Sequence, residues 1–283
     1  MNVVTREIPQ QTSFLALTWK MHRAKIGVAI TLAVVALALV GPFFAPFRST
    51  EFVDMPNTVN VPGTLFGTDF LGQDVWSRFL FGGRSILFLA ATSTLIGVLM
   101  GAALGVLAAY VKGALSALIM RTFDIIIAFP GILLALLLVS MFGSSSALII
   151  LATVIVKIPR IGRIIHGAAV SVVEKDFVSS ATAIGESRSR IVFREILPNV
   201  TSTLLVEANL RFTYSISTIA SLAFLGFTSD PTGANWGTMV QENSIAIILQ
   251  PWGVALPVIA IALLTIGTGL IGDALSRVSA GID

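Results

Sequence analysis

The sequence predicts an all-α, polytopic membrane protein with six transmembrane helices. Of its 283 residues, 55% are hydrophobic and only 12% are charged, whereas soluble domains carry about 25% charged residues. The mean hydropathy is +0.91, and the uncharged residues fall in long runs. These observations exclude a soluble globular protein, a disordered chain and a nucleic-acid binder.

A transmembrane helix needs about 20 mainly apolar residues, and the uncharged runs meet this requirement in order along the chain. The run 122–156 contains one charge, Asp124, and is too long for one helix, so we divide it at Gly143 to Ser146. We expect the fourth span to end near Lys157, whose long side chain reaches the membrane surface. The six predicted spans cover residues 26–47, 85–111, 122–142, 147–158, 200–227 and 243–272.

The placement of lysine and arginine predicts the orientation, because basic residues are retained on the cytoplasmic side. With both termini inside, the inner segments hold 14 of the 18 basic residues and the outer segments hold three. The predicted organisation is a cytoplasmic segment at 1–25, a first helix at 26–47, an outer segment at 48–84 and a five-helix transmembrane domain at 85–283. That domain contains a long cytoplasmic segment at 157–199.

The inner segment contains a short amphipathic helix. Its apolar residues recur at i, i+1, i+4 and i+7, namely Phe177, Val178, Ala181 and Ile184. Gly185 stands where a helix end favours a left-handed residue, and Ser187 is placed to cap a second helix that ends before Pro198. The pattern fits two alternatives equally: a helical pair lying on the anionic leaflet, or a docking element for a cytoplasmic partner.

Two stretches carry distinctive motifs: residues 176–199 read DFVSSATAIGESRSRIVFREILPN, and residues 67–78 read GTDFLGQDVWSR. The first is similar to the EAA loop of ABC-importer permeases, and the second is similar to the signature GTDxxGRDxxSR of their peptide-type branch, which fits best. Further matches follow at 121–131, 222–226 and 272–273. The resemblance implies the type I ABC-importer permease fold in a bacterial inner membrane.

The resemblance assigns two groups of residues. The ATPase-coupling loop comprises Phe177, Val178, Ser179, Ser180, Ala181, Ile184, Gly185, Glu195 and Pro198. The periplasmic signature comprises Gly67, Thr68, Asp69, Gly72, Asp74, Ser77 and Arg78. The chain departs from the family pattern at Ser179 and Ser180, where glutamate and alanine are usual, at Glu195, where histidine is common, and at Gln73, where arginine is usual.

The resemblance also implies partners and a function. The chain forms half of a translocation path for dipeptides or oligopeptides, beside a second homologous permease, two cytoplasmic ATPases that bind ATP and Mg, and an extracytoplasmic binding protein. Nickel, opines and oligosaccharides are alternative cargoes of related systems. The chain has no G-x-x-x-x-G-K-[ST] motif, so we expect no ATPase site in it. With no cysteine and two histidines, we also expect no resident metal or cofactor.

The charged residues of the outer segment and of the predicted spans fit either a structural or a functional role. In the outer segment, Asp69 and Asp74 can pair with Arg78 and Arg84 or cap helices, or they can meet a peptide's ends or a binding protein. Within the spans, the candidates stand at i, i+4 or i, i+3 spacing, where they can neutralise each other or line the path. They are Glu207 with Arg211 and Arg121 with Asp124.

Two rival classes remain. An ATP-independent secondary transporter or channel would carry coupling charges in its spans and usually a larger or repeated set of helices. An intramembrane enzyme is disfavoured because the chain has no cysteine, no HExxH pair and no GxSxG motif.

Overall fold

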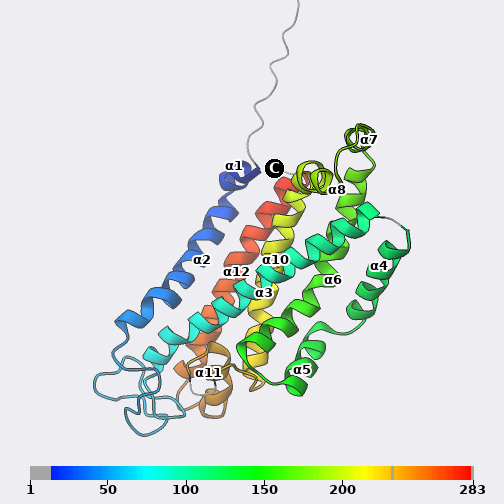
Figure 1. Ribbon diagram of the computed structural model, residues 1–283. Helices are drawn as coiled ribbons and strands as arrows, with labels where there is room; N and C mark the ends of the chain where they lie inside the picture. The colour runs from blue at the N-terminus through cyan, green and yellow to red at the C-terminus, as the bar shows by residue number, and fades with distance from the viewer. Residues whose placement is uncertain (1–13, 112, 231–232, 282–283) are drawn as a thin grey trace, which may run out of the picture.

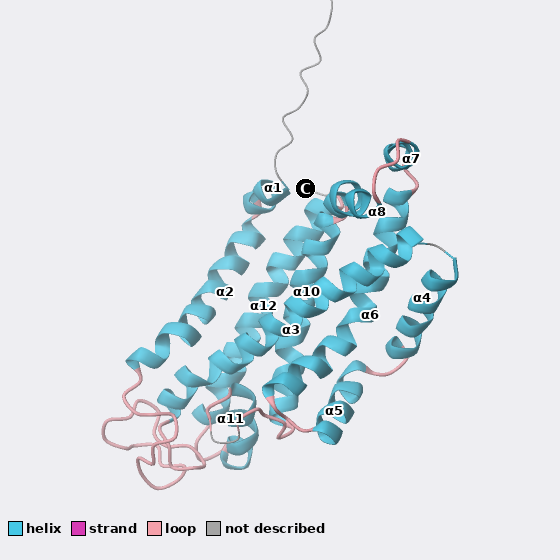
Figure 2. Ribbon diagram, viewed as in Figure 1, coloured by secondary structure: helices cyan, strands magenta, loops and turns pink. Residues whose placement is uncertain are grey.

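The computed structural model describes residues 14–111, 113–230 and 233–281. Within these residues the regular elements are helices, and the only β pairing consists of two isolated bridges, Phe52 with Gln73 and Thr68 with Asp74. Figure 2 shows the helices joined by loops. The predicted all-α class is confirmed. Of the predicted N-terminal segment 1–25, residues 1–13 lie outside the described residues.

The helices form an elongated bundle with two distinct ends (Figure 1). One end, here called the α7 end, carries α1, α7, α8 and the last turn of α12, and the opposite α11 end carries α11 and the loop 45–74. The helices are α1 Phe14–Lys20, α2 His22–Val40, α3 Val75–Val111, α4 Gly113–Ile127, α5 Gly131–Phe142, α6 Ser146–Val173, α7 Asp176–Ala183, α8 Arg188–Arg190, α9 Leu197–Asn199, α10 Thr201–Phe224, α11 Trp236–Asn243 and α12 Trp252–Ser279. Shorter turns are η1 Gly41–Phe44, the π-helical η2 Ile191–Ile196 and η3 Ser244–Ala246.

Three described helices are long and apolar enough to cross a membrane. They are α2 with its following turn, α3 and α12, with mean hydropathies of 2.5, 2.1 and 2.4. The consecutive helices α4 and α5 make a fourth span if they are counted together across their bend of 87°. Neither α6 nor α10 meets the same criterion, so length and hydropathy support three or four of the six predicted spans.

The bend between α4 and α5 coincides with Pro130. Proline lacks a backbone N–H and disfavours helical geometry in the residue before it, so the helix stops at Ile127 and resumes at Gly131. The predicted third span at 122–142 is therefore a broken helix that starts earlier, at Gly113.

Two helices extend past charges that the sequence analysis used as span ends. Helix α3 begins at Val75 and not at residue 85, because Arg78 is ion-paired and Arg84 donates from Nη2 to the Leu39 carbonyl oxygen at 2.6 Å. Helix α6 continues to Val173, so Lys157 lies inside it. The expectation that Lys157 ends the fourth span and reaches the surface is wrong, since its side chain is buried.

A stripe of glycines brings α3 and α6 into close contact. A Cβ atom placed on Gly101 would lie 2.7 Å from the Cβ of Ile161, and one on Gly105 would lie 2.5 Å from the carbonyl oxygen of Gly162. Only glycine permits this approach of two helix backbones. The glycine stripe of α3 therefore packs against α6 of the same chain.

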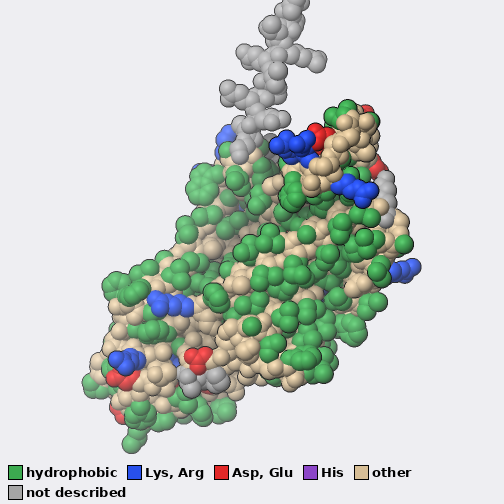
Figure 3. Space-filling model, in the orientation of Figure 1, with side chains coloured by type: hydrophobic (Ala, Val, Ile, Leu, Met, Phe, Trp, Pro, Cys, Tyr) green, Lys and Arg blue, Asp and Glu red, His purple; other side chains and the backbone are tan. Residues whose placement is uncertain are grey.

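Apolar side chains are distributed as a lipid environment requires. Figure 3 shows hydrophobic side chains covering the middle of the face in view, with most charged side chains lying toward the two ends. Inside the bundle, one buried cluster surrounds Trp236 at the α11 end, and a second contains Val178, Ile191 and Ile196 at the α7 end. The two clusters support the two candidate sites described next.

Candidate functional site

The segment 67–78 at the α11 end leads directly into α3. The Asp74 carboxylate caps that helix, because its Oδ2 accepts hydrogen bonds from the Ser77 backbone N at 2.8 Å and from the Ser77 Oγ at 2.6 Å. An aspartate before the first helical turn satisfies N–H groups that have no partner in the helix and also favours the helix dipole. Asp74 and Ser77 thus fix where α3 begins.

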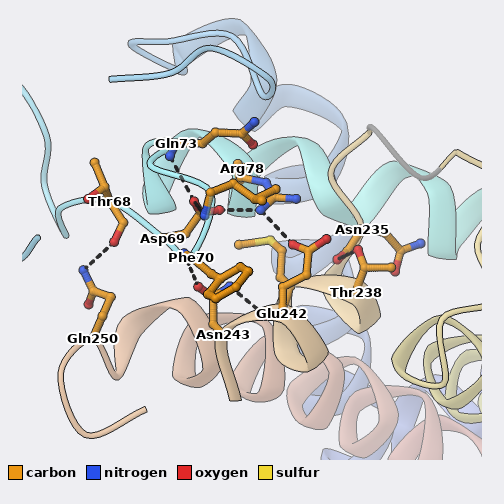
Figure 4. A network of polar contacts seen from close by, with 12 residues as sticks. Thr68, Asp69, Phe70, Gln73, Arg78, Asn235, Thr238, Glu242, Asn243 and Gln250 are labelled. Atoms are coloured by element: carbon orange, nitrogen blue, oxygen red, sulfur yellow. Dashed lines mark hydrogen bonds and ion pairs between the residues drawn. The ribbon is translucent and has the colours of Figure 1, made fainter. Parts of the chain in front are cut away.

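Asp69 and Arg78 form a buried ion pair (Figure 4). Asp69 Oδ1 accepts from the backbone N of Leu71 at 2.8 Å and of Gln73 at 2.9 Å, while its Oδ2 pairs with Arg78. Arg78 Nη1 also contacts Glu242 Oε2 at 2.9 Å. The Arg78 side chain is 1% exposed and that of Asp69 is 0% exposed. The two residues are therefore structural partners, held away from solvent.

Further hydrogen bonds join this segment to the C-terminal part of the chain. The Phe70 backbone N donates to Asn243 Oδ1 at 2.9 Å, and Gln250 Nε2 donates to the Phe66 carbonyl oxygen at 2.6 Å. We call Asp69, Arg78, Glu242, Asn243 and Gln250 the Arg78 network (Figure 4). The sequence analysis missed its last three members. The available signal was the run of polar residues at 241–244, together with Gln250, in the largely apolar stretch 236–257.

The glycines and Thr68 of this segment set the path of its backbone. Gly67 has φ +77°, and a Cβ there would lie 2.1 Å from the Thr58 carbonyl oxygen. Gly72 has φ +74°, and a Cβ there would lie 2.4 Å from the Asp54 carbonyl oxygen. Thr68 Oγ1 donates to the Met55 carbonyl oxygen at 2.6 Å. All seven predicted signature residues thus lie close together, five in the loop that leads into α3 and two, Ser77 and Arg78, in the first turn of that helix.

At the α7 end, helix α7 presents two different faces. Val178 is buried, and Ala181 packs against the same apolar cluster. Phe177 and Ile184 point outward, with 38% and 79% of their surfaces exposed. Ser179 and Ser180 are also exposed. The predicted apolar ridge is therefore divided: part of it anchors α7 to the bundle, and part of it remains uncovered in this chain.

Gly185 ends α7 in the geometry that the sequence predicts. Its φ is +82°, its N–H donates to the Thr182 carbonyl oxygen at 3.1 Å, and the Glu186 N–H donates to the Ala181 carbonyl oxygen at 3.1 Å. These bonds satisfy carbonyl groups that a helix end otherwise leaves unpaired. The predicted left-handed cap is confirmed.

The prediction of a second helix ending before Pro198 is wrong. A helical stretch continues from α8 through the π-helical turn η2 into α9, which contains Pro198. In η2 the Leu197 N–H bonds to the Val192 carbonyl oxygen, five residues back, so the wider turn accommodates a proline that cannot donate. Ser187 stands at the predicted cap position without a side-chain cap bond. The Asn199 side chain donates to the Glu195 carbonyl oxygen at 2.6 Å.

The structure confirms one of the two charge pairs that the spacings within the spans predict and replaces the other. Arg211 Nε and Nη2 donate to Glu207 Oε2 at 2.9 and 2.8 Å, which confirms that pair. Asp124 instead pairs with Arg163 of α6 at 2.6 Å, while Arg121 is exposed. Pairing of Arg121 with Asp124 is therefore wrong, because the packing of α4 on α6 brings another arginine within reach.

Lys157 lies in the middle of the bundle beside the Glu207–Arg211 pair. Its side chain is 5% exposed, and Nζ donates to Ser93 Oγ of α3 at 2.8 Å. Lys157 also lines a pocket of about 470 Å³ together with Arg160 and Arg211. Sequence reasoning missed this site because it placed Lys157 at the membrane surface.

Comparison with known proteins identifies the family. Residues 101–280 match the family described as the binding-protein-dependent transport system inner membrane component. The chain belongs to this family. The match includes α7, Lys157 and the Glu207–Arg211 pair, and confirms both the inner-membrane location and the resemblance to ABC-importer permeases.

Similar proteins cover nearly the whole chain. The glutathione transport system permease protein GsiD of Pectobacterium atrosepticum is 33% identical over 90% of this chain and 86% of its own length. GsiD of Shigella dysenteriae is 34% identical over 90% of this chain and 85% of its own length. An inward-facing structure of the MetNI methionine ABC transporter has a TM-score of 0.55 at 18% identity, covering 71% of this chain and 97% of that chain. That likeness supports the permease fold.

Proposed function

We propose that this chain is the permease subunit of an ATP-driven importer for small peptides of the dipeptide or glutathione class. The observation that carries the proposal is 34% identity to glutathione permeases across 90% of the chain. The chain forms one half of the path, beside a second permease. An extracytoplasmic binding protein delivers the cargo, and two cytoplasmic ATPases bind ATP and Mg.

The proposed topology has six crossings with both termini in the cytoplasm. In Figure 1, the six units α2, α3, α4 with α5, α6, α10 and α12 run alternately between the two ends of the bundle. The charges of α6 and α10 lower their hydropathy, but Lys157 and Glu207 are buried among other helices and do not face lipid. The described chain ends and α7 share one end, which we assign to the cytoplasm.

Cysteine labelling tests this topology directly, because the chain contains no cysteine. Ile184 and Ile248 are both highly exposed. Ile184 directly follows α7, and Ile248 lies between α11 and α12, so the two residues belong to opposite ends of the bundle. We expect a membrane-impermeant maleimide to label Ile248→Cys in intact cells and Ile184→Cys only after permeabilisation. Labelling of both residues from outside would contradict the proposed arrangement.

The exposed part of α7 supports a coupling role. Phe177 and Ile184 offer apolar side chains to a groove on an ATPase, while Val178 connects the helix to the bundle. A rigid helix attached in this way can pass a displacement to the spans behind it. Because the chain has no phosphate-binding loop of its own, the energy comes from the partner subunits.

Reconstitution tests the function. The chain is assembled in liposomes with a second permease, a binding protein and two ATPases of the same importer, and uptake of labelled glutathione, Ala-Ala, nickel and an oligosaccharide is measured. We expect ATP-dependent uptake of the peptides and none when the ATPases are omitted. Uptake without ATPases would favour a secondary transporter or channel, and uptake of nickel or sugar alone would replace the peptide assignment.

A further inference from the structure

A charged pocket lies midway between the two ends of the bundle. It has a volume of about 470 Å³ and is formed by the start of α5 and by one face each of α6 and α10. Lys157 stands about 16 Å along α6 from Ser146 at 1.5 Å per residue, close to the middle of a hydrocarbon core about 30 Å thick. Pockets for small ligands have volumes of roughly 300–1,000 Å³, so a short peptide fits.

The cations of this pocket exceed its anions. Among residues 14–111, 113–230 and 233–281, no carboxylate forms an ion pair with Lys157 or Arg160. No acidic residue is among the described residues that line the pocket, and Glu207, four residues before Arg211 on α10, is already engaged by Nε and Nη2 of that arginine. Arg211 and Lys157 line the same pocket, so their like charges repel each other. Of Lys157, Arg160 and Arg211, only Arg211 therefore has a carboxylate partner among the described residues.

Lys157 has unused bonding capacity. An ammonium group carries three donors, and the only hydrogen bond of Lys157 Nζ within the described residues is to Ser93 Oγ. Burying a cation without an anionic partner is costly in a membrane interior. The position therefore has a strong preference for an incoming negative charge.

Arg160 is placed to share such a charge. A Cβ on Gly131 would lie 2.9 Å from Arg160 Nη1, so the guanidinium lies directly over the start of α5. A planar guanidinium can bind both oxygens of a carboxylate at once. Ile132, Leu210 and Tyr214 add less polar surface to the lining, which suits the side chains of a peptide.

We propose that this pocket binds the carboxylate of the transported peptide through Lys157 and Arg160, while Glu207 holds Arg211 in position. The inference rests on the proposed function and deepens it. It assigns a cargo contact to the permease itself, separate from any selection by the binding protein.

The test measures equilibrium binding to the importer in nanodiscs without its binding protein, so that the permease alone selects. Labelled glutathione and Ala-Ala are displaced by the unlabelled acids and by their C-terminal amides. We expect the acids to bind at least about tenfold more tightly than the amides. Equal affinity for acids and amides, or no binding of the acids, would overturn the inference.

Three variants locate the effect. Lys157→Met and Arg160→Gln should each weaken binding of the acids about tenfold and leave binding of the amides unchanged. Arg163→Gln is the matched control, because that arginine is exposed and pairs with Asp124 outside the pocket. If Lys157→Met fails to insert, Arg160→Gln, at a half-buried position, still decides the result.

Two further outcomes separate the inference from the proposed function. If the wild-type complex imports peptide in an ATP-dependent way but the Lys157→Met and Arg160→Gln complexes still prefer the acids to the amides, the inference alone is overturned. Absence of import by the wild type would overturn the proposed function. Loss of the second permease from both variant complexes, with acid preference retained, would instead assign the two cations to the subunit interface and overturn the inference.

Discussion

The two ends of the bundle are organised by different forces. At the α11 end, buried polar side chains of the Arg78 network join segments far apart in the sequence, and Arg78 is 1% exposed. At the α7 end, a short helix is anchored by Val178 and leaves Phe177 and Ile184 uncovered. The comparison teaches that a conspicuous charged motif can be internal scaffolding, while a plain apolar helix offers the surface available to a partner. Four substitutions test this contrast.

The largest expected effect on stability is at Arg78. Arg78→Ala leaves the carboxylates of Asp69 and Glu242 close together without a cation, and removing one partner of a buried ion pair costs about 3–5 kcal/mol. We expect a marked loss of inserted protein and a lower unfolding temperature in detergent. Arg84→Ala is the control, because Arg84 bonds a carbonyl and lies over the Phe43 ring. Equal stability of Arg78→Ala and Arg84→Ala would contradict the structural role of the Arg78 network.

The second prediction concerns the backbone at the α11 end. In Gly67→Ala the new Cβ would lie 2.1 Å from the Thr58 carbonyl oxygen, and the residue would have to keep a positive φ. The expected loss of unfolding free energy therefore exceeds the cost of the backbone strain alone, which is about 1–3 kcal/mol. Gly113→Ala separates the two causes, because Gly113 has φ +68° and no atom within 4 Å of its Cβ position. Thermal unfolding should rank Gly67→Ala as the less stable variant.

The anchor of α7 gives a smaller effect on stability. Val178→Ala removes part of a buried side chain and should cost about 1.5 kcal/mol. Because α7 would separate from the bundle more readily, we expect faster hydrogen exchange confined to α7 and to the π-helical turn η2. Unchanged exchange there would contradict the anchoring role of Val178.

The smallest effect on stability is expected at Phe177. Phe177→Asp changes an exposed side chain and should alter the unfolding free energy by no more than about 0.5 kcal/mol. Uptake should nevertheless be abolished, because a charge replaces the apolar contact offered to the ATPase. Insertion, unfolding temperature and uptake are measured on the same preparation, with Ser179→Ala as an exposed control. Normal uptake by Phe177→Asp would contradict the coupling proposal.

Local features were predictable from the sequence, and long-range pairing was not. The spacing of Phe177, Val178 and Ile184 and the glycine at 185 depend on neighbouring residues, so a helix and its left-handed end follow from them. The bond between Arg78 and Glu242 joins residues 164 positions apart, and nothing in the sequence analysis indicated that contact.

The same limit explains the errors in the spans. From the sequence alone, a charged residue predicts the end of a membrane span, because the sequence does not show whether the charge is buried or paired within the bundle. Lys157 was assigned to a surface, although Ser93 and the packed helices enclose it. The i, i+3 spacing predicts an ion pair of Asp124 with Arg121, whereas the partner in the structure is Arg163, which comes from another helix. Six crossings and cytoplasmic termini stay predictions.

The close fit at Gly101 and Gly105 has a mechanical consequence. At Gly105 the backbones of α3 and α6 meet directly, and at Gly101 the Ile161 side chain packs onto the glycine, so we expect the two helices to move together as a stiff lever. Helix α3 has 37 residues, which is about 55 Å at 1.5 Å per residue. If α7 receives a push from an ATPase, as proposed above, this lever would carry the displacement to the capped start of α3 at the opposite end of the bundle.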